Sequence, residues 1–425
     1  MEHLSRELQY VSDLFGEAKN RGLMFLESQK DEGSNNIIHY KGKRLTNFIT
    51  NSYLALENDP RVKKAAIEGI EKYGVFSSVS RTYLSFDHYL ELEAKLEKIY
   101  GLPTFLVNNV SLGHFAYLPL IIGPNDAIIT DQFVHKSVNI AVQYLKGGGI
   151  YSEVLRHNQM GDLEKRIKIL SESYSKVWYL TDGVFSMQGD VAPFADLEVL
   201  LNAYDKFHLY IDDAHGMSWI GENGKGYCFH KLPRHEKMYV ISSLNKGFGA
   251  TNAAMVFPNQ KAKDLVHKLG LPVIFSSPTM HAGITAASAL ADIHLSEEIY
   301  ERQAMLNERI KFFKQQVREL EIPLISPNSH TPIGFIVLGS VEAMAQFGEK
   351  MQDRGFIMSI ASFPSVPLKH SGFRVSISLH QSMKDIENLL NNTVESIAEL
   401  EKSGVFNREI VFRNLKQTER KRELI

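Results

Sequence analysis

Cysteine is almost absent from this chain of 425 residues, in which Cys228 is the only one. A single cysteine excludes an intrachain disulfide and a cysteine-rich zinc site, and it suits a reducing cytoplasm. An excess of charge of one sign is also lacking, because 47 Lys and Arg against 49 Asp and Glu leave a net charge of −2. Without a basic footprint, we expect no nucleic-acid partner.

Long hydrophobic runs are lacking as well. The longest, residues 115–122, is interrupted by Pro119, whereas a bilayer-spanning helix needs about 20 apolar residues. The first fifteen residues, MEHLSRELQYVSDLF, contain acids and no apolar stretch, so we expect no secretory signal. Hydrophobic residues make up 44% of the chain and charged residues 23%, which argues against global disorder. We therefore predict a cytoplasmic globular protein without a transmembrane segment.

Short β-rich apolar runs alternate with helical patterns through the first two thirds of the chain. The runs are residues 104–107, 127–129, 177–180, 209–211, 239–241 and 253–256, and helical patterns include 162–171 and 197–204. Apolar strands that alternate with helices predict an α/β fold, with a mostly parallel sheet covered on both faces. In such sheets, functional groups gather at the carboxyl ends of the strands.

The same patterns predict four regions. Residues 1–45 form an N-terminal helical arm, 46–285 a large domain, 286–402 a smaller C-terminal α+β domain, and 403–425 a charged tail. The smaller domain is expected to be helical to residue 320, with strands at 334–338, 358–360 and 373–377 and a helix at 383–400. For the tail, a solvated helix or frayed end is favoured over a partner-binding segment.

Four polar segments follow or end predicted strands. Asp212, Asp213 and His215 lie in IDDAHG, where a carboxylate at the end of an apolar strand needs a cationic partner. The alternative is a helix N-cap with a solvated neighbour. His135 follows the run 127–129 and is either a ring-stacking or proton-shuttling residue or a structural histidine. The segment TDGVFSMQGD begins at residue 181 and contains a glycine turn.

Lys246 lies in SLNKGFG, between a strand and a Gly-x-Gly turn. A lysine at a strand end becomes a Schiff-base nucleophile when burial or a cationic neighbour lowers its pKa. The alternative is a solvated loop lysine.

Together these segments resemble the α-oxoamine synthases, a family of pyridoxal-phosphate (PLP) enzymes of fold type I. The resemblance covers residues 38–390. Its strongest pieces are TNSYLAL at 50–56, TDGVFSMQGDVAP at 181–193, IDDAHG at 211–216, SLNKGFGA at 243–250, FSSP at 275–278 and PSVP with FRVSISL within 364–379. The resemblance implies a large PLP-binding domain with a seven-stranded sheet and a smaller C-terminal domain.

The resemblance also implies the cofactor-binding residues. Lys246 matches the Schiff-base lysine, Asp212 the partner of the pyridinium nitrogen, His215 the ligand of the 3′-oxygen and His135 the residue stacked on the ring. Asp213 is then a structural neighbour. Further cofactor contacts are implied for Val110, Ser111, Ser186, Ser243, Ser276 and Ser277. One of the last two reaches the phosphate of the other subunit, which implies a homodimer with shared active sites.

The implied reaction joins an amino acid to an acyl thioester, on coenzyme A or an acyl carrier protein, and yields an α-amino ketone, CO2 and a free thiol. Arg374 matches the arginine that binds the amino-acid carboxylate, and Asn51 matches a polar residue near it. No metal is required, and the sequence offers no cluster of metal ligands.

Two segments depart from the family pattern. Val110 stands where a glycine is usual, and YGVFSSVSR at 73–81 has Phe76 and Val79 where small residues are common. The second departure concerns the substrate entrance, so it bears on substrate identity. Two alternatives stay open: another fold type I enzyme (an aminotransferase, aldolase or decarboxylase), and a non-catalytic subunit, which the presence of Lys246 disfavours.

Overall fold

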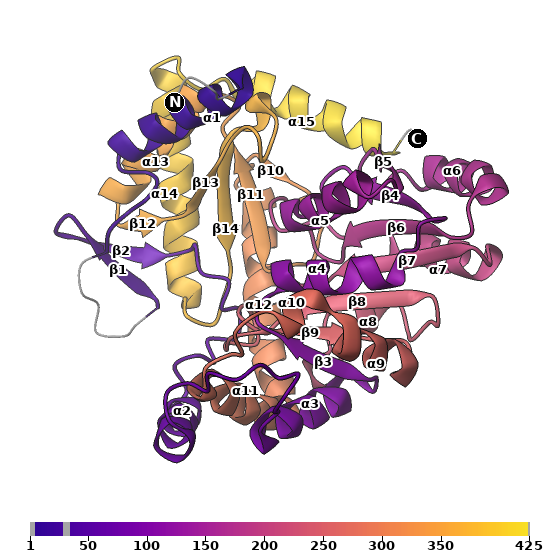
Figure 1. Cartoon of the computed structure of the whole chain (residues 1–425). Helices are drawn as coiled ribbons and strands as arrows, with labels where there is room; N and C mark the ends of the chain where they lie inside the picture. Colours follow the sequence, from indigo (N-terminus) through magenta and orange to yellow (C-terminus); the bar gives the residue numbers. More distant parts are fainter. Residues whose placement is uncertain (1–4, 29–34, 424–425) are drawn as a thin grey trace. The chain divides into compact units, whose positions relative to one another are not determined.

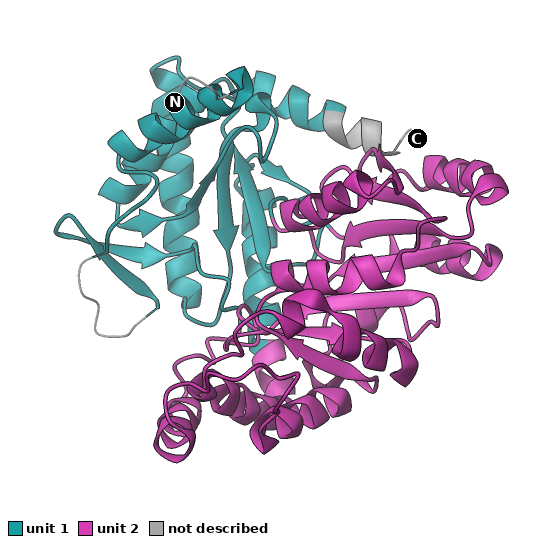
Figure 2. Ribbon diagram, viewed as in Figure 1, with its two compact units in different colours: residues 1–53, 187–190, 305–424 teal, residues 54–186, 191–304, 425 magenta. Residues whose placement is uncertain are grey.

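The computed structural model describes residues 5–28 and 35–423, with side chains to residue 417, as two compact units (Figure 2). Unit 1 contains the described residues of 1–53, 187–190 and 305–424, and unit 2 contains residues 54–186 and 191–304. This division differs from the predicted regions, because the N-terminal and C-terminal segments both belong to unit 1. Backbone pairing explains why, since Phe356 lies beside Thr46 in a shared sheet.

Unit 2 is built on a seven-stranded sheet of order β3-β9-β8-β7-β6-β4-β5 (Figure 1). Strands β8, β7, β6, β4 and β5 are parallel, and β9 pairs antiparallel with both β8 and β3. The strands are β3 (Thr104–Val107), β4 (Ala127–Asp131), β5 (Tyr151–Leu155), β6 (Val177–Asp182), β7 (Phe207–Asp212), β8 (Met238–Ser243) and β9 (Ala253–Val256). The predicted mostly parallel α/β fold is confirmed.

The helices of unit 2 connect and cover these strands. They are α2 (Pro60–Tyr73), α3 (Asp87–Tyr100), α4 (Val110–Ile121), α5 (Lys136–Gly147), α6 (Met160–Ser173), α7 (Phe194–Ala203), α8 (Tyr227–Lys231), α9 (Gln260–Leu269), α10 (Leu271–Ile274) and α11 (His281–His294), with a 3-10 turn η1 (Glu222–Gly224). Helix α12 (Glu298–Glu319) begins in unit 2 and ends in unit 1.

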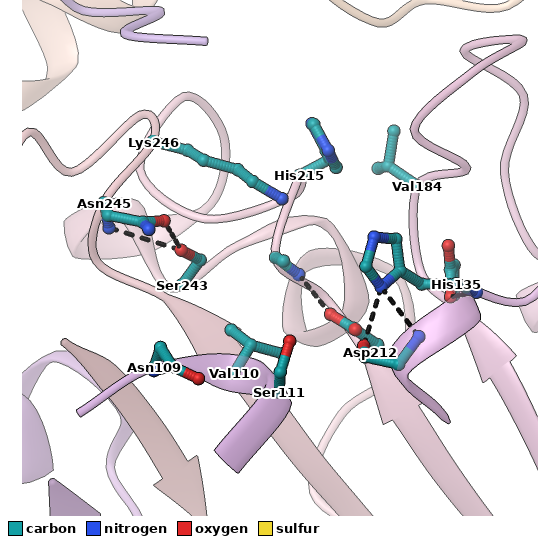
Figure 3. A pocket seen from close by; sticks show the side chains of 13 residues that line it. Asn109, Val110, Ser111, His135, Val184, Asp212, His215, Ser243, Asn245 and Lys246 are labelled. Carbon is teal, nitrogen blue, oxygen red and sulfur yellow. Dashed lines mark hydrogen bonds between the residues drawn. The ribbon is translucent and has the colours of Figure 1, made fainter. Parts of the chain in front are cut away.

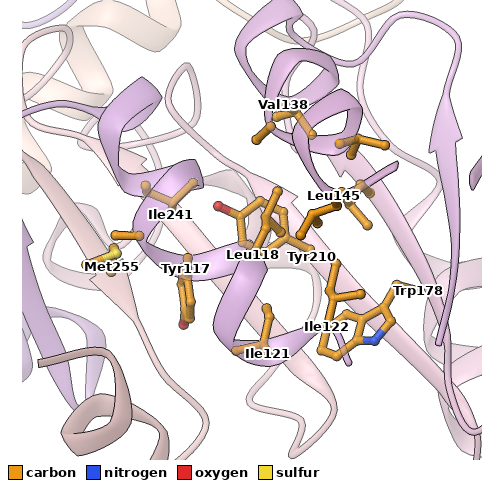
Figure 4. Close-up of a cluster of buried hydrophobic side chains, with 14 of the residues drawn as sticks. Tyr117, Leu118, Ile121, Ile122, Val138, Leu145, Trp178, Tyr210, Ile241 and Met255 are labelled. Atoms are coloured by element: carbon orange, nitrogen blue, oxygen red, sulfur yellow. The ribbon is translucent and has the colours of Figure 1, made fainter. Parts of the chain in front are cut away.

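The largest core of unit 2 lies between α4, α5 and the sheet. Tyr117 and Leu118 of α4 and Val138 of α5 pack against strand residues that include Trp178 and Tyr210 (Figure 4). All five side chains are fully buried. Burial of this apolar surface fixes α4 against the strands, and thereby sets where its first turn lies.

Unit 1 contains a four-stranded antiparallel sheet of order β10-β11-β14-β13 and a three-stranded sheet of order β1-β2-β12. Its strands are β1 (Ile37–Tyr40), β2 (Lys43–Asn47), β10 (Leu324–Ile325), β11 (Ile333–Val337), β12 (Phe356–Ile357), β13 (Ser359–Ala361) and β14 (Gly372–Ser376). Its other elements are α1 (Arg6–Asn20), α13 (Val341–Asp353), η2 (Leu368–His370), α14 (Met383–Lys402) and α15 (Arg408–Glu423).

The charged C-terminal segment is more ordered than a frayed tail. It forms α15, and Val411 and Leu415 on its first half are buried in unit 1. Arg408 ties the start of this helix to Glu401 at 3.0 Å. Among all described helices, none combines the length and the apolar character needed to cross a bilayer.

Candidate active site

Polar residues end four neighbouring parallel strands of unit 2. Asp131 ends β4, Asp182 ends β6, Asp212 ends β7 and Ser243 ends β8. Because parallel strands share the edge at which they end, these side chains gather on one side of the sheet.

A cavity of about 240 Å3 opens at this edge (Figure 3). Its lining residues are Asn109, Val110, Ser111, His135, Ser137, Asp182, Val184, Asp212, Ala214, His215, Ser243, Asn245 and Lys246. Seven of the residues named from the sequence line it: Val110, Ser111, His135, Asp212, His215, Ser243 and Lys246. The strand-end positions inferred from sequence thus converge on one cavity.

Asp212 is a buried carboxylate with a polar neighbour at each oxygen. Its Oδ1 accepts the backbone N–H of Ala214 at 3.0 Å, and its Oδ2 lies 3.2 Å from Nε2 of His114 on α4. Burial opposes ionisation, but His114 and the nearby positive charge of Lys246 outweigh it, so the pKa of Asp212 is below its ordinary value. The cavity therefore contains a fixed negative charge that can meet a protonated ring nitrogen.

Asp182, which the sequence argument did not single out, lies beside Asp212 with their Cα atoms in register. Burial and the adjacent charge of Asp212 raise the pKa of Asp182 well above its ordinary value, although its Oδ1 accepts the backbone N–H of His135 at 3.0 Å. The surroundings thus favour the proton on Asp182 and the negative charge on Asp212. The position of Asp182 just after the apolar run 177–180 was the sequence signal that could have identified it.

Asp213 has a different environment from its neighbour. A Cβ on Gly183, Gly216 or Gly226 would lie within 2.5 Å of the Asp213 carboxyl group. Its Oδ2 accepts the backbone N–H of Cys228 at 3.0 Å, and burial raises its pKa to about 8. Asp213 does not line the cavity, in keeping with the structural role expected for it.

The first turn of α4 supplies backbone donors to the cavity. Asn109 caps the helix by accepting the N–H of Leu112 at 2.8 Å, and Val110 and Ser111 are the first two helical residues. The N–H groups of a first helical turn and the helix dipole favour an anion. Because Val110 has a helical backbone, the glycine that is usual in the family is not needed here.

Lys246 extends into the cavity from the turn after β8, and His215 does so from the turn after β7 (Figure 3). The Lys246 turn is closed by a hydrogen bond from the N–H of Gly249 to the Lys246 carbonyl at 3.0 Å. Gly249 has φ of +91°, which disfavours a side chain, and a Cβ there would lie only 3.1 Å from the backbone N of Glu57. The Ser243 hydroxyl, near the base of this turn, hydrogen-bonds Asn245.

The remaining candidates lie elsewhere. Ser186, Ser276 and Ser277 belong to unit 2 but do not line the cavity, and Ser277 is exposed. Asn51 and Arg374 belong to unit 1, where Nη2 of Arg374 donates to Oδ1 of Asn51 at 2.8 Å. The structure therefore brings these two residues together, as their shared assignment from the sequence predicts.

The residues of the cavity fit PLP. A phosphate needs clustered N–H and hydroxyl donors, which the first turn of α4 and Ser243 provide. A pyridinium nitrogen needs an ionised carboxylate, and an aldehyde needs an amine, which are Asp212 and Lys246. The donor set thus contains a partner for each reactive end of the cofactor.

Comparisons with known proteins agree with this chemistry. The family model described as aminotransferase class I and II matches residues 43–392. The 8-amino-7-oxononanoate synthase of Alkaliphilus metalliredigens is 30% identical over 363 residues, which cover 85% of this chain and 89% of that protein. The enzyme of the same name from Thermosipho melanesiensis is 29% identical over 376 residues, or 87% of this chain and 93% of that protein.

Among solved structures, the serine palmitoyltransferase of Sphingomonas wittichii superposes with a TM-score of 0.85 at 19% identity, covering 95% of this chain and 100% of that chain. At this identity the superposition shows the shared fold alone. With the family match over 350 residues, the chain belongs to the aminotransferase class I and II family and, within it, to the α-oxoamine synthases, which are PLP-dependent acyltransferases.

Proposed function

We propose that this enzyme carries out a decarboxylative, Claisen-type condensation of an amino acid with an acyl thioester, on coenzyme A or a carrier protein. The products are an α-amino ketone, CO2 and a free thiol. The observation that carries the proposal is the convergence of Lys246, Asp212 and the first turn of α4 on one cavity. The names of the similar 8-amino-7-oxononanoate synthases support the same reaction class.

In this proposal each end of the cofactor has its own residues. The N–H groups of Val110 and Ser111 and the hydroxyl of Ser243 would bind the phosphate. Asp212 would keep the ring nitrogen protonated, and His215 would donate to the 3′-oxygen. His135 would lie against the ring, and Ser186 would contribute near the substrate. When bound, the cofactor supplies an electron sink that stabilises negative charge at the substrate Cα.

Lys246 then has two roles in the reaction. Its amine would hold the cofactor aldehyde until the substrate amine displaces it, and the freed amine would then take the proton from the substrate Cα. The electron pair left at Cα forms the new bond to the acyl carbon, while the carbon–sulfur bond breaks and the thiolate leaves. Loss of the substrate carboxylate as CO2 leaves an electron pair at Cα, which Lys246 reprotonates.

We assign the binding of the amino-acid carboxylate to Arg374, supported by Asn51. Burial lowers the pKa of the Arg374 guanidinium, which reflects the cost of placing a cation in a poorly solvated position. A bidentate pair with a carboxylate would offset that cost and orient the substrate.

We also propose a homodimer that acts in the cytoplasm. Exposed aromatic side chains support the dimer, because Tyr83 is 86% and Phe275 81% exposed. The two segments that carry them lie together, since the Ser80 hydroxyl donates to the Ile274 carbonyl at 2.8 Å. Ser276 and Ser277 follow Phe275 directly, so the partner's phosphate site is the proposed target of one of their hydroxyls.

The test is a thiol-release assay that screens the twenty amino acids against short, medium and long acyl-CoAs. We expect release to require both substrates and to fall by about a hundredfold or more in Lys246→Ala, because the proton-transfer group is lost. Lys98→Ala, which alters an exposed lysine of α3, is the control and should retain full activity. Amino-group transfer to a keto acid without a thioester would instead identify an aminotransferase.

A further inference from the structure

A buried histidine lies directly behind the carboxylate of the cavity. His114 of α4 is 0% exposed, and its Nε2 lies 3.2 Å from Oδ2 of Asp212. Its other ring nitrogen, Nδ1, lies 2.8 Å from the hydroxyl of Tyr210 on β7. The three side chains therefore form a line from the core of unit 2 to the edge of the cavity, and His114 itself does not line the cavity.

The contacts determine which ring nitrogen carries hydrogen. Burial raises the pKa of Tyr210 well above its ordinary value, so its hydroxyl stays protonated and can donate to Nδ1. A neutral imidazole that accepts at Nδ1 carries its hydrogen at Nε2. Nε2 lies 3.2 Å from Oδ2 of Asp212, so the two groups interact electrostatically although no aligned hydrogen bond joins them, and the other oxygen of Asp212 accepts the N–H of Ala214 at 3.0 Å.

Asp212 needs a neighbour that favours its ionised form, because Asp182 lies beside it and competes for the negative charge. The two carboxyl groups end adjacent strands with their Cα atoms in register, and both are buried. Two buried carboxylates side by side cannot both ionise cheaply, so the environment decides which keeps its proton. His114 faces Asp212, whereas the backbone N–H of His135 faces Asp182.

We propose that His114 is a positioning residue, which, itself supported by Tyr210, holds Asp212 ionised and oriented toward the cofactor ring nitrogen. The inference rests on the role of Asp212 in the proposed function and extends it to a residue with no counterpart in the sequence argument. Helix α4 then serves both ends of the cofactor. Its first turn, at Val110 and Ser111, binds the phosphate, and the next turn, at His114, controls the carboxylate at the ring nitrogen.

The test compares affinities of the cofactor-depleted full chain for PLP and for the analogue in which CH replaces the ring nitrogen. The parent should prefer PLP. In His114→Leu, we expect affinity for PLP to fall by about tenfold or more, because Asp212 loses its polar neighbour at Oδ2, with affinity for the analogue unchanged. His114→Gln, whose amide can donate in place of Nε2, should retain most of the preference.

The matched control is His294→Leu, because His294 is also buried in unit 2 with both ring nitrogens bonded, to Leu290 and Ser218 at 2.8 and 2.9 Å. It should lower the unfolding temperature without changing the ratio of the two affinities. An unchanged ratio in His114→Leu would overturn the inference and leave the proposed function standing. If the parent protein binds PLP and the analogue equally, both the inference and the assigned role of Asp212 are wrong. If the parent prefers PLP but releases no thiol, only the proposed reaction is contradicted.

Discussion

At the scale of residues, three neighbouring aspartates show how position in the fold decides protonation. His114 and Lys246 lower the pKa of Asp212, whereas burial and the charge of Asp212 raise the pKa of Asp182. Burial raises the pKa of Asp213 to about 8, and the glycines around it leave the space that its carboxyl group fills. Three residues of one type thus differ in which form, charged or neutral, their surroundings favour.

The pKa of Asp213 predicts a pH dependence of stability. An aspartate in the unfolded chain has a pKa of about 3.9, and burial raises that of Asp213 to about 8. Between these pH values the folded chain keeps a proton that the unfolded chain loses, so this group makes the free energy of unfolding fall as pH rises. Asp213→Asn should remove that decline, which is at most about 1.4 kcal/mol per pH unit.

The measurement is denaturant unfolding of parent and variant between pH 4 and pH 8, with the difference between the two curves as the readout. Asp196→Asn, at an exposed acid of α7, controls for loss of an aspartate. Parallel curves for Asp213→Asn and the parent would contradict the protonated assignment.

Lys246, Asp212, His215 and His135 were predictable as a site because each follows an apolar run and matches a family segment. Asp182 and His114 were not identified. Asp182 lies in a quoted segment without a partner that sequence alone reveals, and His114 lies within an apolar helix, where a structural histidine is the ordinary expectation. Their importance comes from strand pairing, which places Asp182 beside Asp212, and from helix packing, which brings His114 to 3.2 Å from Asp212.

At the scale of elements, α4 is the helix whose placement matters most, and Gly113 allows it to approach the sheet. A Cβ at Gly113 would lie 2.3 Å from Cδ1 of Ile241 and 3.2 Å from Cγ1 of Val107. We expect Gly113→Val to lower the free energy of unfolding by about 1–3 kcal/mol, the usual cost of overpacking. Cofactor affinity should fall with it, since α4 would move away from β8.

Gly16→Val in α1 is the matched control, because no heavy atom lies within 4 Å of a Cβ at that position. Its free energy of unfolding should change by less than about 0.5 kcal/mol, as measured by denaturant unfolding. Equal effects of the two substitutions would show that Gly113 is not a packing position.

The strands at 104–107, 177–180 and 253–256 were predicted because they are apolar and buried on both faces. Strand β5 was missed because it lies at the edge of the sheet, where YSEVL is largely exposed and lacks a continuous apolar pattern. Edge strands depend on pairing with a neighbour, here β4, rather than on their own composition.

At the scale of the whole molecule, the proposed homodimer predicts a solution mass of twice 48.1 kDa. Tyr83 and Phe275 are highly exposed aromatic residues on segments that the Ser80–Ile274 hydrogen bond joins. The double variant Tyr83→Glu, Phe275→Glu should be monomeric in light scattering, and its affinity for PLP should fall about tenfold or more as charged-group hydrogen bonds from the partner are lost. The control is Val199→Glu, at a 65% exposed position of α7, which should remain dimeric. A monomeric parent protein would contradict the proposed homodimer.

The sequence by itself determined the fold class, the family and seven of the residues that line the cavity, because alternating apolar runs and six matching segments are local properties of the chain. Only the tertiary structure decided which carboxyl group is ionised, which histidine stands behind it, and that the two ends of the chain join one unit. Those outcomes depend on desolvation and on distances between residues far apart in the chain, and neither quantity is encoded in any single segment.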